Sequence, residues 1–102
     1  MREHYEANLA YYLAKALRSN AKRRAENRAL IMELKSVPCT NCGVAYPPWV
    51  MEFDHVRGKK LFNVSEGLAH RADALLAEAA KCEIVCSNCH RDRTYRRLTA
   101  RP

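Results

Sequence analysis

The chain has 102 residues, and its 18 Lys or Arg against 11 Asp or Glu give a formal net charge of +7. Hydrophobic residues make up 48% of the chain, which is enough for one folded domain or for a small core with an appended arm. No apolar run approaches the roughly 20 residues of a membrane span, and no apolar signal segment opens the chain. We therefore expect a cytoplasmic, reducing location and no membrane partner.

Positive charge gathers at both ends of the chain. Residues 1–36 hold eight Lys or Arg against four Asp or Glu, residues 91–102 hold five against one, and residues 37–90 hold five against six. Basic flanks suit a polyanion, because each phosphate that they neutralise releases counterions. Basic helices also simply keep small proteins in solution, so charge alone leaves both interpretations open.

The first 36 residues are expected to form a helical arm. Residues 2–35 contain no Gly or Pro and are rich in helix-favouring residues. Ser19-Asn20 is a candidate interruption, and Pro38 predicts an end at about Val37. We expect an apolar stripe on this arm to pack on the core or on a second copy of the chain, and a basic patch is a candidate DNA contact. The stripe comprises Tyr5, Leu9, Tyr12, Leu13, Ala16 and Leu17, and the patch comprises Lys22, Arg23, Arg24 and Arg28.

The centre of the chain predicts short strands around one helix. Residues 49–53 alternate like a strand, with Trp49, Met51 and Phe53 on one face. After a turn at residues 57–60, residues 61–64 suggest a short extended return. A helix is expected from an N-cap at Ser65 to about Lys81, a strand at residues 82–85 and a last helix after Cys89. The buried face of the middle helix is expected to comprise Leu68, Leu75, Leu76 and Ala79.

Two C-x-x-C pairs, Cys39/Cys42 and Cys86/Cys89, predict a zinc site. A core this small commonly needs a staple, and in a reducing compartment paired C-x-x-C motifs bind zinc more often than they form disulfides. Four thiolates from two distant segments can close one tetrahedral site. Cys82 is a competing ligand, but we expect it to be a buried, inert thiol on a strand.

Five motifs share the spacing of a known family. They are Cys39-Thr40-Asn41-Cys42, Phe53-Asp54-His55-Val56, the Gly58-Lys59-Lys60 turn, Cys86-Ser87-Asn88-Cys89-His90-Arg91, and Thr94. With these motifs the sequence resembles the HNH endonucleases, especially the small zinc-containing ones of phage genomes. The resemblance covers roughly residues 37–95, and the N-terminal arm lies outside it.

The resemblance implies a small α+β fold with a ββα-metal core, in which a β-hairpin and a helix surround one divalent ion. It implies that His55 is the general base and that Asp54 and His90 hold the catalytic ion. The four cysteines of the C-x-x-C pairs look like the structural zinc set of this subgroup. The chain would then divide into a basic helical arm, residues 1–36, and an HNH nuclease domain with zinc knuckles, residues 37–102. A phage-encoded protein of this kind acts in the cytoplasm of a bacterial host.

The chemistry of phosphodiester hydrolysis independently needs these residue types. An imidazole titrates near neutral pH and can deprotonate water. A divalent cation held by few protein ligands neutralises charge on phosphate oxygens. The oxygen ligand Asp54 suits Mg²⁺ or Mn²⁺, whereas His90 favours a transition metal, so the identity of the catalytic ion stays open.

Two details depart from a simple match. Adjacent strand residues point to opposite faces, so Asp54 and His55 can both face the metal only where the strand ends or bulges. HNH enzymes usually carry an asparagine about nine residues before the final histidine, where it braces the loop that bears the base. Lys81 stands near that position here, and Asn63 and Asn88 are the candidates to replace the asparagine.

We therefore expect a metal-dependent HNH endonuclease that hydrolyses DNA, with a structural Zn²⁺ and a separate catalytic Mg²⁺, Mn²⁺ or other divalent transition metal. The alternative is a non-catalytic zinc-binding DNA protein, a regulator or a packaging accessory, on the same scaffold. The histidines favour the enzyme and the missing asparagine favours the alternative, while a monomer and a homodimer remain equally open. The basic residues expected to contact the DNA backbone are Lys59, Lys60, Arg91, Arg93, Arg96 and Arg97.

Overall fold

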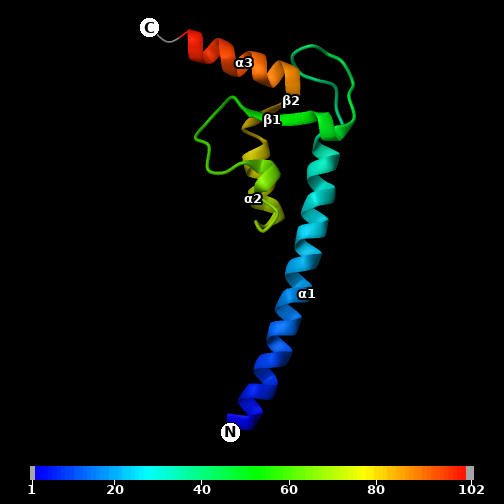
Figure 1. Ribbon diagram of the computed structural model, residues 1–102, viewed down its shortest axis with the longest axis vertical. Coiled ribbons are helices and arrows are strands. Elements are labelled where there is room, and N and C mark those ends of the chain that lie inside the picture. The colour runs from blue at the N-terminus through cyan, green and yellow to red at the C-terminus, as the bar shows by residue number, and fades with distance from the viewer. Residues whose placement is uncertain (1, 101–102) are drawn as a thin grey trace.

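The computed structural model of the protein describes residues 2–100, with the side chains of residues 8–100. It measures 66 × 33 × 18 Å, because one long helix projects from a small layered body (Figure 1). In chain order the elements are α1 (Arg2–Leu34), η1 (Pro48–Val50), β1 (Met51–His55), η2 (Val64–Glu66), α2 (Ala72–Ala79), β2 (Cys82–Cys86) and α3 (Ser87–Thr99). Among these helices of residues 2–100, none combines the length and the hydropathy that a membrane crossing demands. The predicted α+β class is confirmed.

The sheet consists of β1 and β2, which are antiparallel and pair without interruption from Met51↔Cys86 to His55↔Cys82. The connection between them is residues 56–81, which include α2, so the two strands do not form a tight hairpin. Helix α3 follows β2 directly. It lies on one face of the sheet, and α2 lies on the other face (Figure 1).

Two buried clusters hold the body together. One joins α1, β1, η2 and α2 through Ile31, Phe53, Val64 and Leu75. The other lies under the cysteine pairs and comprises Cys39, Met51, Val85 and Cys86. Because Met51 and Phe53 are both buried, the alternation predicted for this strand is confirmed for its second half.

Strand β1 begins two residues later than predicted. Pro47 and Pro48 fix the backbone in the turn η1, where the Val50 N–H donates to the Pro47 carbonyl at 2.9 Å. Trp49 lies in this turn and is 75% exposed. The expectation that Trp49 shares a buried strand face with Met51 is therefore wrong.

Helix α2 also begins later than predicted, because the chain first folds tightly around Phe62. The Phe62 ring stacks on His70, with centroids 3.9 Å apart, and a Cβ at Gly67 would lie 2.7 Å from the Phe62 side chain. Residues 64–66 form η2, so Ser65 is not the N-cap of a helix, and residues 61–64 are not a strand. Of the predicted buried face, Leu68, Leu75 and Ala79 contact the core, and Leu76 is 47% exposed.

Helix α1 packs on the body through its C-terminal part. It runs without a break through Ser19-Asn20 and ends at Leu34, three residues before the predicted end. Ile31 is buried, and the Asn27 side-chain amide donates to the Leu68 and His70 carbonyls at 2.8 and 2.6 Å. The division of the chain at residue 36 stays a prediction.

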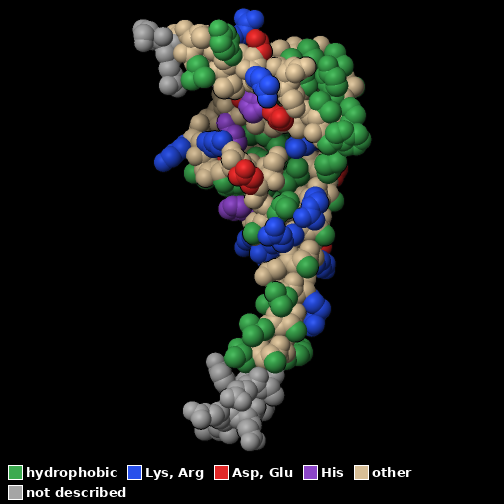
Figure 2. All heavy atoms as spheres, in the orientation of Figure 1, with side chains coloured by type: hydrophobic (Ala, Val, Ile, Leu, Met, Phe, Trp, Pro, Cys, Tyr) green, Lys and Arg blue, Asp and Glu red, His purple; other side chains and the backbone are tan. Residues whose placement is uncertain are grey.

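The described residues of the apolar stripe on α1, from Leu9 onward, are exposed and do not pack on the core, because the helix projects away from it (Figure 1). Figure 2 shows hydrophobic side chains exposed on the N-terminal half of the arm and Lys or Arg gathered over its middle. Leu17, for example, is 70% exposed. The alternative covering, a second copy of the chain, stays a prediction, and the Tyr5 side chain lies outside the described residues.

Candidate functional site

The two C-x-x-C pairs meet in space. The four thiol sulfurs, of Cys39, Cys42, Cys86 and Cys89, all lie within 4.8 Å of one another. All four cysteines are free of disulfides. In tetrahedral zinc the sulfurs stand about 3.8 Å apart, as Zn–S bonds of about 2.3 Å require. This four-cysteine cluster can therefore hold a metal ion, and zinc suits four thiolates.

Local backbone geometry builds this cluster. In the first knuckle the Gly43 N–H donates to the Cys39 carbonyl at 2.8 Å, and Gly43 takes a φ of +77°. The sulfur of Cys39 also accepts the Cys86 N–H at 3.3 Å, which links the knuckle to the end of β2. In the second knuckle Cys86 is the N-cap of α3, and its sulfur accepts the Cys89 N–H at 3.4 Å.

The pKa values of two thiols of the cluster, Cys39 and Cys89, are shifted in opposite directions. Burial raises the pKa of Cys39, but backbone N–H groups of Cys42 and Cys86 outweigh it and lower the pKa to about 6. A contact with Asn41 lowers the pKa of Cys89, but the neighbouring Cys86 sulfur and burial outweigh that contact and raise it to about 12. One thiolate thus disfavours the next, and a bound cation is what allows all four to ionise together.

Cys82 stays outside the cluster. Its thiol donates to the Glu78 carbonyl at 3.6 Å, and burial, helped by the charges of Glu78 and Asp54, raises its pKa to about 11. A thiol with this pKa is a poor nucleophile and a poor metal ligand near neutral pH. Cys82 lies on β2 as expected, but it is half-buried rather than buried, and its inertness stays a prediction.

The residues of the Asp54-His55 pair separate to the two faces of the sheet. The β1–β2 register is regular through His55, so the bulge that would turn both side chains to one face is not present in β1. Asp54 lies under α3 and is 2% exposed, whereas His55 faces α2. The two histidines nevertheless both line one pocket of about 330 Å³.

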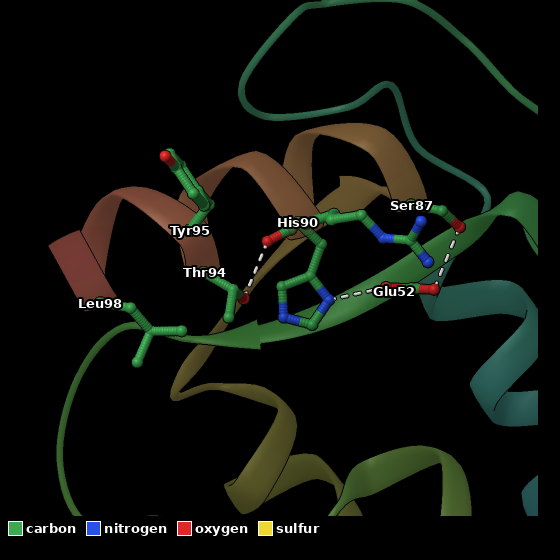
Figure 3. Close-up of a pocket in the computed structure, with 7 residues that line it drawn as sticks. Glu52, Ser87, His90, Thr94, Tyr95 and Leu98 are labelled. Atoms are coloured by element: carbon green, nitrogen blue, oxygen red, sulfur yellow. Dashed lines mark hydrogen bonds and ion pairs between the residues drawn. The ribbon is translucent and has the colours of Figure 1, made fainter.

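On the α3 face, His90 is held by Glu52. The ring Nδ1 lies 2.7 Å from Glu52 Oε1, and Ser87 Oγ donates to Glu52 Oε2 at 3.0 Å (Figure 3). These hydrogen bonds outweigh burial and lower the pKa of Glu52, so its carboxylate acts as an acceptor and Nδ1 carries the proton. In the neutral ring the other nitrogen, Nε2, is then an acceptor, and it lies 3.6 Å from Asp54 Oδ1.

Asp54 is neutralised by two arginines of α3. Arg97 donates to Oδ1 at 2.7 Å and to Oδ2 at 2.8 Å, and Arg93 donates to Oδ2 at 2.9 Å. The Arg97 bonds, against burial and with help from Arg93, lower the pKa of Asp54 to about 2. A carboxylate offers about four acceptor positions, so three are used and the fourth is on Oδ1, the oxygen beside His90.

On the α2 face, His55 is held by Glu78. The His55 Nε2 atom lies 2.9 Å from Glu78 Oε2, and the Glu78 side chain is 1% exposed. The Lys81 ammonium, against burial and with help from the Leu61 N–H, lowers the pKa of Glu78 to about 2. His55 therefore donates to an ionised carboxylate through Nε2, and its Nδ1 is the ring nitrogen that can accept a proton.

No family model, no curated protein and no solved structure matches this chain.

Function must therefore be argued from the side chains themselves. The structure brings the predicted His55 and His90 to one pocket and places Asp54 beside His90. It also brings the four predicted zinc ligands together. Roles in catalysis and in DNA binding stay predictions.

The predicted DNA-contacting residues divide into two groups. Lys59, Lys60 and Arg91 are exposed, and Arg96 makes only an exposed helical ion pair with Asp92 at 2.8 Å. Arg93 and Arg97 instead donate to Asp54, and Arg93 also donates to Glu83 at 2.8 Å. Both arginines are already paired with carboxylates of the protein, which makes them weaker candidates for phosphate contacts than the first group.

Sequence reasoning missed the residues that orient the histidines. Glu52 precedes Asp54 by two on the strand, so period-two alternation could have placed it on the α3 face. Glu78 carried no such signal, because a glutamate on a helix is usually solvated. Lys35 also lines the pocket, close to the Phe53 ring at 5.5 Å, and burial lowers its pKa.

The candidates for the missing asparagine behave differently. Asn63 lines the same pocket as the histidines, whereas Asn88 is exposed on α3. Lys81, near the expected position, donates through Nζ to the Lys59 carbonyl at 2.7 Å. Its own carbonyl accepts the Val56 N–H at 2.9 Å. A lysine thus ties down the loop after His55.

Proposed function

We propose that the protein is a metal-dependent endonuclease of the HNH type that hydrolyses phosphodiester bonds of DNA. The observation that carries the proposal is the pocket shared by His55 and His90, with the Asp54 carboxylate beside the free nitrogen of His90. One histidine is then available for proton transfer, and the other, with the carboxylate, for a divalent ion. Asp54 is buried behind the pocket and does not line it, but it adjoins His90, which does.

The donor set beside α3 fits a divalent ion. His90 Nε2 and the fourth acceptor position of Asp54 Oδ1 face each other, and Glu52 fixes the ring of His90 through Nδ1. A carboxylate behind a histidine is the usual support of a metal ligand, since it sets the tautomer and raises ligand basicity. When bound, the ion supplies charge neutralisation at phosphate and leaving oxygens. One oxygen and one nitrogen ligand suit Mn²⁺ or another transition metal as well as Mg²⁺.

His55 is the proposed general base. Its Nδ1 takes a proton from the attacking water, and its Nε2 stays hydrogen-bonded to Glu78. The His55 side chain is 15% exposed, so it reaches the pocket but sits in a largely fixed position. A fixed base lowers the entropic cost of proton transfer.

The four-cysteine cluster is the proposed structural zinc site. It joins the first knuckle to the start of α3, the helix that carries His90. Four thiolate ligands leave no open coordination position for a substrate, as in structural zinc sites generally. Zinc would therefore hold the site together without taking part in the reaction.

Exposed basic residues provide the proposed contacts to the DNA backbone. Lys59 and Lys60 lie on the loop after His55, Arg91 and Arg96 lie on α3, and Lys35 lines the pocket itself. Contacts to phosphate position a duplex without reading its bases. Low sequence specificity is the expectation that follows.

The test is cleavage of supercoiled plasmid by the purified chain with Mg²⁺, Mn²⁺ or Ni²⁺. We expect nicked or linear product with at least one ion, and a single-turnover rate about a hundredfold to ten-thousandfold lower for His55→Ala. Zinc content and DNA affinity of this variant should be nearly unchanged. His70→Ala, which removes an imidazole outside the pocket, is the matched control. Equal rates for wild type and His55→Ala would contradict the assignment.

A non-catalytic zinc-binding DNA protein is the second candidate. The observation in its favour is that Arg93 and Arg97 already neutralise Asp54, as they would in a scaffold that holds no second ion. This candidate predicts DNA binding with no cleavage under any of the three ions. The plasmid experiment therefore separates the two functions directly.

A further inference from the structure

The Glu78 carboxylate is buried and accepts three hydrogen bonds. Its Oε2 accepts His55 Nε2 at 2.9 Å and the Leu61 N–H at 3.0 Å, and its Oε1 accepts the Lys81 ammonium at 2.8 Å. A buried carboxylate is costly unless such donors surround it. Apolar packing of α2 against the core would need no carboxylate here, so the group has a specific reason to be inside.

Lys81 and the loop after His55 hold Glu78 in place. Lys81 bridges the carboxylate and the Lys59 carbonyl, and its own carbonyl accepts the N–H groups of Val56 and Arg57 at 2.9 and 3.2 Å. The end of α2 is thereby tied to the segment that immediately follows the proposed base. Glu78 and His55 cannot shift apart without breaking this set of bonds.

We propose that Glu78 is the positioning residue of His55, an inference that rests on the proposed nuclease function. Because an ionised carboxylate only accepts hydrogen bonds, it holds the neutral imidazole with its proton on Nε2 and leaves Nδ1 to receive a proton. Without Glu78 the ring would populate both tautomers and more than one orientation. Only one of those states presents a basic nitrogen in the right place.

Glu78 would support His55 while water is deprotonated and the phosphodiester bond is broken. His55 Nδ1 takes one proton from a water molecule, and the water oxygen forms a bond to phosphorus. The bond from phosphorus to the leaving sugar oxygen breaks, and that oxygen takes a proton from solvent. The imidazolium then returns its proton to solvent. Glu78 stays ionised throughout and faces the positive charge that forms on the ring.

The test compares Glu78→Gln, His55→Ala and the double variant in the full chain. We expect Glu78→Gln to lower the single-turnover cleavage rate about tenfold to a hundredfold, as a supporting carboxylate does elsewhere. In the His55→Ala background the same change should have no further effect, because the group that it positions is absent. Plasmid affinity and zinc content should not change, and Glu78→Asp should restore part of the rate.

A purely structural Glu78 would slow both backgrounds by the same factor, and that result would overturn the proposal. So would nitrogen NMR of the wild-type ring that shows the His55 proton on Nδ1, a measurement that needs no variant and holds even if Glu78→Gln does not fold. Failure of the nuclease proposal looks different, because wild type itself would then leave plasmid uncut. If Glu78→Gln cut plasmid as fast as wild type while His55→Ala did not cut, only the role proposed for Glu78 would be wrong.

Discussion

The two faces of β1 support their histidines in different ways. On the α3 face His90 bonds to Glu52, whose side chain is 45% exposed, and on the α2 face His55 bonds to Glu78, whose side chain is 1% exposed. Solvent screens the first pair, whereas the second lies in a medium of lower dielectric, where each bond is stronger and its loss more costly. Under the proposed function, the more exposed pair would serve ligand exchange and the buried pair would serve proton transfer.

Loss of zinc should disrupt the support of both histidines. The four-cysteine cluster ties the first knuckle to β2 and α3, and structural zinc contributes an apparent ~10–16 kcal/mol, as much as a small domain's whole stability. We expect about one Zn²⁺ per chain, and loss of most folded structure of the body after chelation or in Cys39→Ser, seen by circular dichroism. Cys82→Ser, outside the cluster, is the control and should keep its zinc.

Less than half a zinc per chain in carefully prepared protein would count against this assignment. So would a disulfide within either C-x-x-C pair, or a cooperative melt that chelators do not affect.

The metal dependence of cleavage should distinguish the two faces. Asp54→Asn and His90→Ala each remove a proposed ligand, so the metal concentration for half-maximal rate should rise at least about tenfold, and excess metal should restore part of the rate. His55→Ala should not respond to metal, because the lost group transfers a proton. A metal titration under single-turnover conditions measures both. If excess metal rescues His55→Ala as well as Asp54→Asn, the division of roles between the faces is wrong.

Acid should weaken the Glu78–His55 pair more than the Glu52–His90 pair. The pKa of Glu78 is about 2 in the folded chain, below the roughly 4.3 of an unfolded glutamate. Its stabilisation is therefore complete above about pH 4.3 and is lost as the pH falls toward 2. The melting temperature of wild type should exceed that of Glu78→Gln near neutral pH, and the gap should close over that window. Glu52→Gln should show a smaller gap, and equal gaps would contradict the comparison.

The sequence predicted the ligand chemistry better than the backbone path. Spacing alone identified the four cysteines, since two C-x-x-C pairs have few other uses in a reducing compartment. Period two placed Met51 and Phe53 in the core. It failed at Trp49, because two prolines set a turn that overrides strand propensity. The N-cap predicted at Ser65 is wrong, because the Phe62–His70 stack and Gly67 delay α2. The second error comes from side-chain packing that no local pattern records.

The orientation of the two histidines was beyond the sequence. Asp54 and His55 could both face a metal only at a strand end or a bulge, and the regular register of β1 places them on opposite faces. His55 and His90 nevertheless line one pocket. Their hydrogen-bond partners are distant in the sequence, as Glu52 is 38 residues from His90. Such pairings depend on which residues the fold brings together, and an isolated glutamate in a sequence does not show its partner.

Cys86 ends β2, caps α3 and belongs to the four-cysteine cluster, so no linker separates the sheet from the helix that carries His90. Chain length is therefore not free at this junction. One inserted residue between Cys86 and His90 would rotate His90 by about 100° around the axis of α3, away from Asp54. The 26-residue connection between the strands carries no such constraint over much of its exposed length. Natural length variation should accumulate there and spare the five positions that run from Cys86 to His90.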